Sequence, residues 1–134
     1  MSIEDQFAAN ARRLFVKPED SIGRMVHASM GISGEAGEIL LTIPDGDCHY
    51  YASEIAIAAS KIIDDVKKTW IYGKELDKEN VLEECGDILF YVSVLLAECG
   101  FTIGDAMRHN VAKLQKRYPE GYSDQHAIAR QDKQ

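Results

Sequence analysis

The chain has 134 residues, 46% of them hydrophobic, and its acidic residues outnumber the basic ones 22 to 15. This length and composition predict a single domain, residues 1–134, with a core of its own. The net charge of −7 argues against a surface that binds DNA, RNA or an anionic membrane through basic residues. The three cysteines form no CxxC pair, so a zinc knuckle or disulfide framework is not expected. The sequence shows no secretory signal and no apolar run of membrane length, and we expect a cytoplasmic protein.

Helix signals dominate from the first residues onward. Ser2 and Asp5 form a capping-box-like pair, and the apolar residues after them recur at helical spacing. A second helix is expected from Asp20 or Ser21 until the turn sequence Pro44-Asp45-Gly46-Asp47. Both segments are therefore predicted to be helices.

Three further helices are bounded by residues that cap or end helices, and we expect them over Tyr51–Tyr72, Asp77–Cys99 and Thr102–Tyr118. Gly73 follows the first of these as a C-terminal cap. Strand signals are nearly absent. The sequence thus predicts an all-α bundle of about five helices, followed by a polar C-terminal tail at about residues 123–134.

The second predicted helix carries two glutamates among glycines. Glu35 and Glu38 lie one turn apart and project from one side of the helix. Gly31, Gly34 and Gly37 recur at spacing three, although each glycine in a helix interior costs about 1 kcal/mol relative to alanine. We expect this stripe to allow close approach of a neighbouring backbone and to leave both carboxylates accessible.

The fourth predicted helix carries a second acid pair, Glu84 and Asp87, just before the apolar run of residues 88–97. Because the helix is apolar nearly all round after its first turns, we expect it to be central in the bundle. The two acids are then placed at the entrance to the core, where unpaired carboxylates are unfavourable and usually bind a cation.

Two helices that each offer two acids form a plausible all-oxygen ligand set for Mg²⁺ or Mn²⁺. Neither pair has a histidine at the fourth position, which argues against a di-iron carboxylate bundle. The alternative is that these acids are solvated helix faces or pair with Lys67, Lys68 and Lys74. Spacing alone does not decide between the two.

The fifth predicted helix has a polar stripe of the opposite sign. Asn110, Lys113 and Arg117 share one face, with Tyr118 next to them. Such a stripe is suited to hold a polyphosphate opposite a metal-loaded acid pair. The alternative is a solvated basic helix end that is stabilised by the helix dipole.

Three segments, HASMGISGEAGEIL, WIYGKELDKENVLEECGDILFYV and NVAKLQKRYPEGYS, closely resemble the MazG-like all-α nucleoside triphosphate pyrophosphohydrolases. The resemblance covers roughly residues 20–123. It implies Mg²⁺-dependent cleavage between the α- and β-phosphates of a nucleoside triphosphate, which gives a monophosphate and pyrophosphate. Mn²⁺ is a possible substitute for Mg²⁺.

The resemblance also implies roles for individual residues. The four acids match metal ligands, and one of Glu35 and Glu38 is expected to accept the proton of the attacking water. The positions matching the substrate-binding side are Asn110, Lys113, Arg117, Tyr118, Tyr91, His27 and Trp70. For His27 and Trp70, a packing role is the alternative.

One segment departs from the family pattern. The interval from Glu38 to Glu84 is longer than usual, and residues 40–61 resemble an insertion that displaces the acidic-basic continuation to residues 64–68. The helix carrying Glu38 is then either extended before it turns back or broken just after Glu38. Because family active sites often include partner residues, we expect a homodimer or homotetramer.

Other functions fit the same residues. A non-catalytic nucleotide-binding or regulatory bundle predicts metal-dependent binding without pyrophosphate release. An enzyme acting on phosphoribosyl-ATP is a second alternative, and a plain helical interaction module is a third. The base and sugar preference and the biological role are left open by the sequence.

Overall fold

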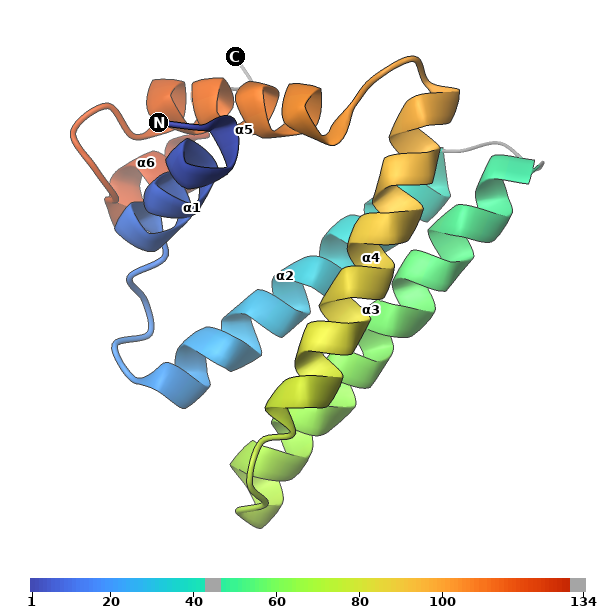
Figure 1. Ribbon diagram of the computed structural model, residues 1–134. Helices are drawn as coiled ribbons and strands as arrows, with labels where there is room; N and C mark the ends of the chain where they lie inside the picture. The colour runs from blue at the N-terminus through green and yellow to red at the C-terminus, as the bar shows by residue number, and fades with distance from the viewer. Residues whose placement is uncertain (43–46, 131–134) are drawn as a thin grey trace. The chain divides into compact units, whose positions relative to one another are not determined.

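The computed structural model describes residues 1–42 and 47–130, with only the backbone described for residues 47–49, and all the regular elements in this part of the chain are helices (Figure 1). In chain order they are α1 Ile3–Leu14, α2 Ser21–Thr42, α3 Asp47–Tyr72, α4 Lys78–Glu98, α5 Ile103–Arg117 and α6 Asp124–Ala129. The predicted all-α fold is confirmed, and α1 to α5 correspond to the five predicted helices.

Local capping chemistry explains where the helices begin and end. Side-chain oxygens at five N-termini accept a hydrogen bond from the backbone N–H three residues on: Ser2, Asp20, Asp77, Thr102 and Ser123. Gly73 and Gly100 follow α3 and α4 with φ of +65° and +79°, values that a residue with a side chain rarely adopts.

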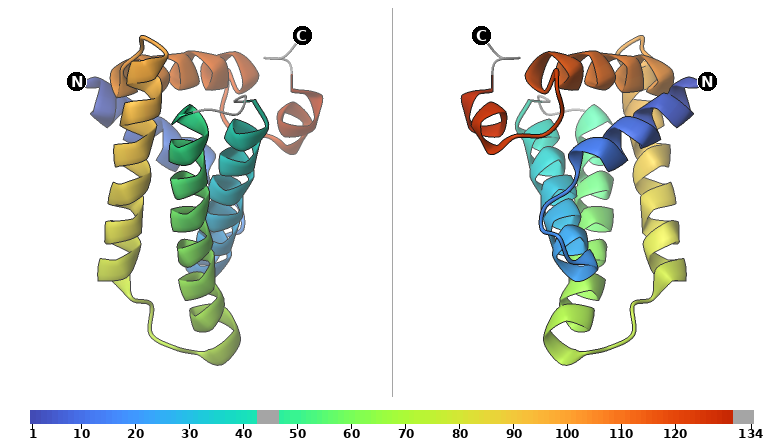
Figure 2. Two further views of the ribbon diagram at one scale, coloured as in Figure 1. Left: turned by 90° about the vertical axis from the view of Figure 1, so that its right-hand side faces the viewer. Right: turned by 90° about the vertical axis from the view of Figure 1, so that its left-hand side faces the viewer.

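The chain forms two compact units, one of residues 1–17 with 101–134 and one of residues 18–100. In the second unit α3 packs against both α2 and α4, as Figures 1 and 2 show. The central helix of this unit is therefore α3, whereas the sequence predicted α4 in that place.

The buried residues of α3 explain its central place. Five of them alternate in spacing between three and four along one stripe: Ala52, Ile55, Ala59, Ile62 and Val66. Ala58 adjoins this stripe and is the third buried alanine. Alanines let neighbouring helices approach closely. Ala36 of α2 joins Ile55 and Ala59 in the core cluster, and half-buried residues of α4 such as Ile88 and Val92 pack against it.

The helix that carries Glu35 and Glu38 continues unbroken to Thr42. Of the two arrangements considered for the long interval after Glu38, the extended helix is therefore the one observed. The segment Leu40–Lys61 supplies the last residues of α2 and the first half of α3. Three of the four residues of the predicted turn at 44–47 lie outside the described residues, and the fourth, Asp47, begins α3.

In the other unit α1 packs against α5. Tyr118 is 6% exposed, and its ring lies against those of Tyr122 and His126 at centroid distances of 5.7 and 6.4 Å. The short helix α6 lies in the segment for which the sequence predicted only a polar tail. It is held by an ion pair of 2.9 Å between Lys17 and Asp124.

Among the described helices, no single one is long and apolar enough to cross a membrane, and α4 and α5 pass such a test only as a broken pair, by length and composition.

Candidate functional site

The most unusual acid of the predicted site is Glu84. This residue is 5% exposed, and it is the buried residue of α4, a helix whose other residues are half-buried or exposed. Its Oε1 lies 3.1 Å from Nζ of Lys61 on α3, whose side chain is 54% exposed. Its other oxygen, Oε2, is buried without a hydrogen-bond partner. A buried carboxylate oxygen in this state is unfavourable unless a cation or donor reaches it.

The antiparallel register of α3 and α4 brings these two side chains together. One turn towards the connection between the helices, Asn80 of α4 donates a hydrogen bond to Asp65 of α3. Lys61 and Asp65 are four residues apart, as are Asn80 and Glu84, so the two contacts are successive steps of one interface. The second acid pair is therefore placed by helix packing and not by a loop.

Lys61 lies in a field of negative charge. Its hydrogen bond to Glu84, followed by the charge of Glu84, raises the pKa of the Lys61 ammonium, and Asp87 and Glu83 raise this pKa further. Asp87 is exposed, one turn beyond Glu84. The acids of α4 thus favour a cation at this position, and in the structure the ammonium of Lys61 supplies it.

The first acid pair lies on another face. Ala36 between the two glutamates is 2% exposed and faces the core, while Glu35 and Glu38 are exposed. At 100° per residue, Glu38 projects from nearly the opposite side of α2 to Ala36. In residues 1–42 and 47–130, no three histidine, cysteine or acidic side chains converge as a metal-binding group. The structure does not bring the two acid pairs together.

The glycines beside these glutamates do not have the expected role. A Cβ built on Gly31, Gly34 or Gly37 would meet nothing within 4 Å, so no neighbouring backbone approaches them. The prediction of close approach was wrong, because the packed side of α2 is the one that carries Ala36. What the small residues do provide is open surface around Glu35 and Glu38.

The predicted nucleoside-side residues are spread over the three helices of this unit. Tyr91 is half-buried on α4, with its ring 6.3 Å from that of Tyr51. Burial and then the charge of Glu54 raise the pKa of the Tyr91 phenol. Trp70 is 60% exposed near the end of α3, and His27 is exposed on α2. In this chain Trp70 is therefore a surface residue and not a core residue.

The predicted phosphate-side residues belong to the other compact unit. Asn110, Lys113 and Arg117 are half-buried on α5. The guanidinium of Arg117 lies 5.9 Å from the centroid of the Tyr118 ring. Tyr118 itself is buried, so in the structure its ring packs within its own unit.

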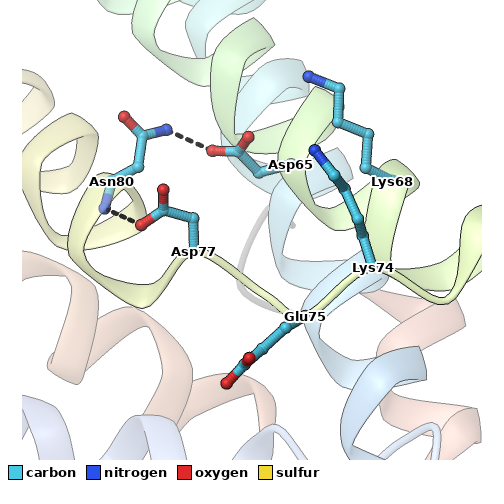
Figure 3. Close-up of a pocket in the computed structure, with 6 residues that line it drawn as sticks. All are labelled: Asp65, Lys68, Lys74, Glu75, Asp77 and Asn80. Atoms are coloured by element: carbon cyan, nitrogen blue, oxygen red, sulfur yellow. Dashed lines mark hydrogen bonds between the residues drawn. The ribbon is translucent and has the colours of Figure 1, made fainter.

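A pocket of about 340 Å³ lies where α3 and α4 are connected (Figure 3), lined by Asp65, Lys68, Lys74, Glu75, Asp77 and Asn80. Figure 3 shows the Asn80 amide directed at Asp65 and its backbone nitrogen at Asp77. Lys67 and Lys68 both pair with Asp64, at 2.6 and 2.5 Å, and hold the pKa of this carboxyl at about 2. Two of the three lysines considered as partners for the site acids, Lys67 and Lys68, thus bind within their own helix, and Lys74 lines the pocket.

The residue that sequence reasoning missed is Lys61. A signal was present, because Lys61 comes two residues after Ala59 and directly before Ile62, at the border of the buried stripe of α3. A lysine at such a border can bury its stem and reach an acid on the neighbouring helix. Which acid it reaches depends on the register of α3 and α4.

The comparisons with known proteins agree with the resemblance. A family model described as the MazG nucleotide pyrophosphohydrolase domain matches residues 27–122, which include all the predicted site residues. No curated protein and no solved structure matches the chain. The matched range is well over half of the sequence and contains both acid pairs, and the chain accordingly belongs to the MazG nucleotide pyrophosphohydrolase family.

Proposed function

We propose that this protein is a Mg²⁺-dependent nucleoside triphosphate pyrophosphohydrolase that releases pyrophosphate and leaves the nucleoside monophosphate. Family membership supports a hydrolase of this class. The observation that carries the metal dependence is Glu84, whose buried Oε2 has no hydrogen-bond partner while Oε1 already holds a cation. A hard oxygen donor of this kind fits Mg²⁺, with Mn²⁺ as a substitute.

Four carboxylates are proposed as metal ligands, in two pairs that the structure does not bring together: Glu35 with Glu38 on α2, and Glu84 with Asp87 on α4. A bound divalent ion offsets phosphate charge and lowers the pKa of a water molecule. The contributions of the side chains are distinct. Glu35 and Glu38 are exposed on α2 and available to water, and one of them accepts the proton of the attacking water. Glu84 is held in one position by its burial.

The hydrolysis forms one bond and breaks one. The water oxygen bonds to the α-phosphorus, the bond from this phosphorus to the bridging oxygen breaks, and pyrophosphate leaves with that oxygen. Lys113 and Arg117 offset the negative charge that develops on the leaving group. Asn110, Tyr118, Tyr91, His27 and Trp70 complete the set of residues proposed to bind the substrate.

A second copy of the chain is part of this proposal. We infer a homodimer or homotetramer, because one face of α4 leaves large apolar side chains exposed, among them Leu82, Leu89 and Phe90. Isolated copies would expose this face to water, whereas a self-associated pair would cover it.

The test is a pyrophosphate-release assay over canonical and modified nucleoside triphosphates, with Mg²⁺, Mn²⁺ and EDTA arms. We expect metal-dependent release with a monophosphate product. The Glu38→Gln variant should lose turnover and keep its helix content, because this side chain is exposed and makes no core contact. Retained turnover in that variant would refute the assignment.

The panel also separates the other functions. Metal-dependent nucleotide binding without pyrophosphate release would identify a non-catalytic nucleotide-binding protein. Turnover of phosphoribosyl-ATP in preference to nucleoside triphosphates would identify the related enzyme class.

A further inference from the structure

The ion pair of Lys61 with Glu84 has a specific consequence for metal binding. We propose that Lys61 is a tethered cation that competes with a divalent metal ion for the Glu84 carboxylate, and so sets how much metal the protein needs. This inference rests on the proposed function, because it takes Glu84 as a metal ligand. Lys61 is neither one of the four acids nor part of the polar face of α5 that carries Lys113 and Arg117.

One oxygen of the Glu84 carboxylate is already occupied by a cation. Glu84 is 5% exposed, and the ammonium of Lys61 lies 3.1 Å from Oε1. A metal ion that binds the unpartnered Oε2 would lie within about 2.0–2.6 Å of that oxygen, on the same carboxylate as the ammonium. Two cations bound to one carboxylate repel each other, and this repulsion weakens metal binding. The metal is therefore bound most tightly when the ammonium moves away.

The side chain of Lys61 can move away from Glu84 without a change in the helices. Its side chain is 54% exposed, and its long stem can rotate the ammonium into solvent. No other hydrogen bond of its ammonium is seen among the described residues. In contrast, Glu84 is fixed by burial in the interface of α3 and α4. The exchange therefore moves one side chain and leaves the helices in place.

Without metal, the negative charges around Glu84 are only partly balanced. Lys61 brings one positive charge to a region in which Glu84, Asp87 and Glu83 all act on it. One oxygen of Glu84 still lacks a partner. The single charge of the ammonium thus stabilises the fold but does not balance all the carboxylates around Glu84. A divalent ion would balance more of this negative charge.

Lys61 reaches Glu84 because of the segment in which it lies. Lys61 is the last residue of the segment 40–61, which resembles an insertion, and it lies within the continuous helix α3. The added helix length brings a lysine to a position opposite the second acid pair. In this chain, the segment would then contribute a residue that lowers the affinity of the site for a divalent metal ion.

The test measures Mn²⁺ binding to the full chain without nucleotide, by electron paramagnetic resonance of the free ion up to millimolar concentration. The variants are Lys61→Met, Glu84→Gln and the control Lys67→Met. Lys67 is on the same helix, is 51% exposed and pairs with Asp64, so its variant removes the same charge away from Glu84.

We expect Lys61→Met to bind Mn²⁺ about threefold to tenfold more tightly than the wild type, the range for a half-exposed ion pair. Lys67→Met should change the affinity by less than about twofold, which isolates the contact from the general loss of positive charge. Without metal, Lys61→Met should also unfold at a lower temperature than Lys67→Met and gain more on addition of Mn²⁺.

The outcomes separate the two proposals. Loss of Mn²⁺ binding in Glu84→Gln together with equal affinities for the two lysine variants overturns the competition and leaves the metal site standing. Wild-type binding in Glu84→Gln, or no binding by any variant, removes Glu84 as a metal ligand and overturns both. Should Lys61→Met lose helix content, Lys61→Gln, which keeps a hydrogen-bond donor, replaces it with the same expectation.

Discussion

Asn80 of α4 donates its side-chain amide to the carboxylate of Asp65 on α3, one helical turn from the ion pair of Lys61 with Glu84. The two contacts fix the register of α3 against α4 along the helix axes. A shift of either helix by one residue would break both of them. The hydrogen bond of Asn80 with Asp65 and the ion pair of Glu84 therefore require the same register of α3 and α4.

We expect Asn80→Ala to lower the free energy of unfolding by about 1–2 kcal/mol, because it leaves the half-buried Asp65 carboxylate without its donor. Urea unfolding followed by circular dichroism measures this. Lys78→Ala is the control, since Lys78 is exposed in the same turn of α4. Equal midpoints for the two variants would show that the contact does not stabilise the helix pair.

The helix boundaries were predictable because capping is local. Asp77 and Thr102 each accept a hydrogen bond from the backbone three residues later, and this signal is readable in a window of four residues. The helix α6 was not predicted, because local signals alone do not account for it. It has only six residues, and part of what holds it is the ion pair of Lys17 with Asp124, a contact between distant parts of the chain.

The candidate site was predictable only in its residue types. Spacing identified Glu84 and Asp87 as a pair on one helix, but it did not show that Glu84 is buried and Asp87 exposed. That difference follows from the rotation of α4 against α3, which long-range packing determines. The orientation of Glu35 and Glu38 likewise depends on the burial of Ala36, which no local pattern reveals.

The open surface around Gly34 leads to a stability prediction. A Cβ at this position meets nothing within 4 Å, so Gly34→Ala should raise the free energy of unfolding by about 0.5–1 kcal/mol by restricting the unfolded chain and favouring the helix. Gly23→Ala on the same helix should do the opposite, because its Cβ would lie 2.7 Å from Asp20 Oδ2 and 2.9 Å from Pro18 Cβ. Thermal unfolding of both variants checks the sign, and a destabilised Gly34→Ala would contradict the packing described for α2.

Acid should weaken the start of α5. The hydroxyl of Thr102, and then Arg108, lower the pKa of Asp105 from 3.8 to about 2. Because the folded pKa lies below the unfolded one, the stabilisation by Asp105 is fully present above pH 3.8 and is lost as the pH falls towards about 2. Asp105→Ala should therefore be less stable than the wild type at neutral pH, and this difference should shrink across that window.

The measurement is the difference in unfolding free energy between wild type and Asp105→Ala at a series of pH values. Asp64, whose pKa is also about 2, titrates in both proteins, so its contribution cancels in the difference. A difference that stays constant down to pH 2, or that already disappears above pH 5, would rule out the capping box as its source.

Self-association through α4 gives the last prediction. Leu82, Leu89 and Phe90 are 74%, 53% and 64% exposed, and the exposed small residues Gly86 and Ser93 share their side of the helix. The positions 82, 86, 89 and 93 alternate in spacing between four and three, as in helices that pack against a parallel or antiparallel copy. Burial of such a side chain contributes about 1.5–3 kcal/mol per residue.

We therefore expect light scattering after size-exclusion chromatography to give at least twice the chain mass of 15.0 kDa. Leu89→Lys should shift this mass towards the monomer, because it places a charge in the apolar face. Leu41→Lys is the matched control, since Leu41 is 89% exposed on α2 and away from that face. A monomeric wild type would exclude the association, and equal oligomer masses for both variants would assign the interface to a surface other than α4.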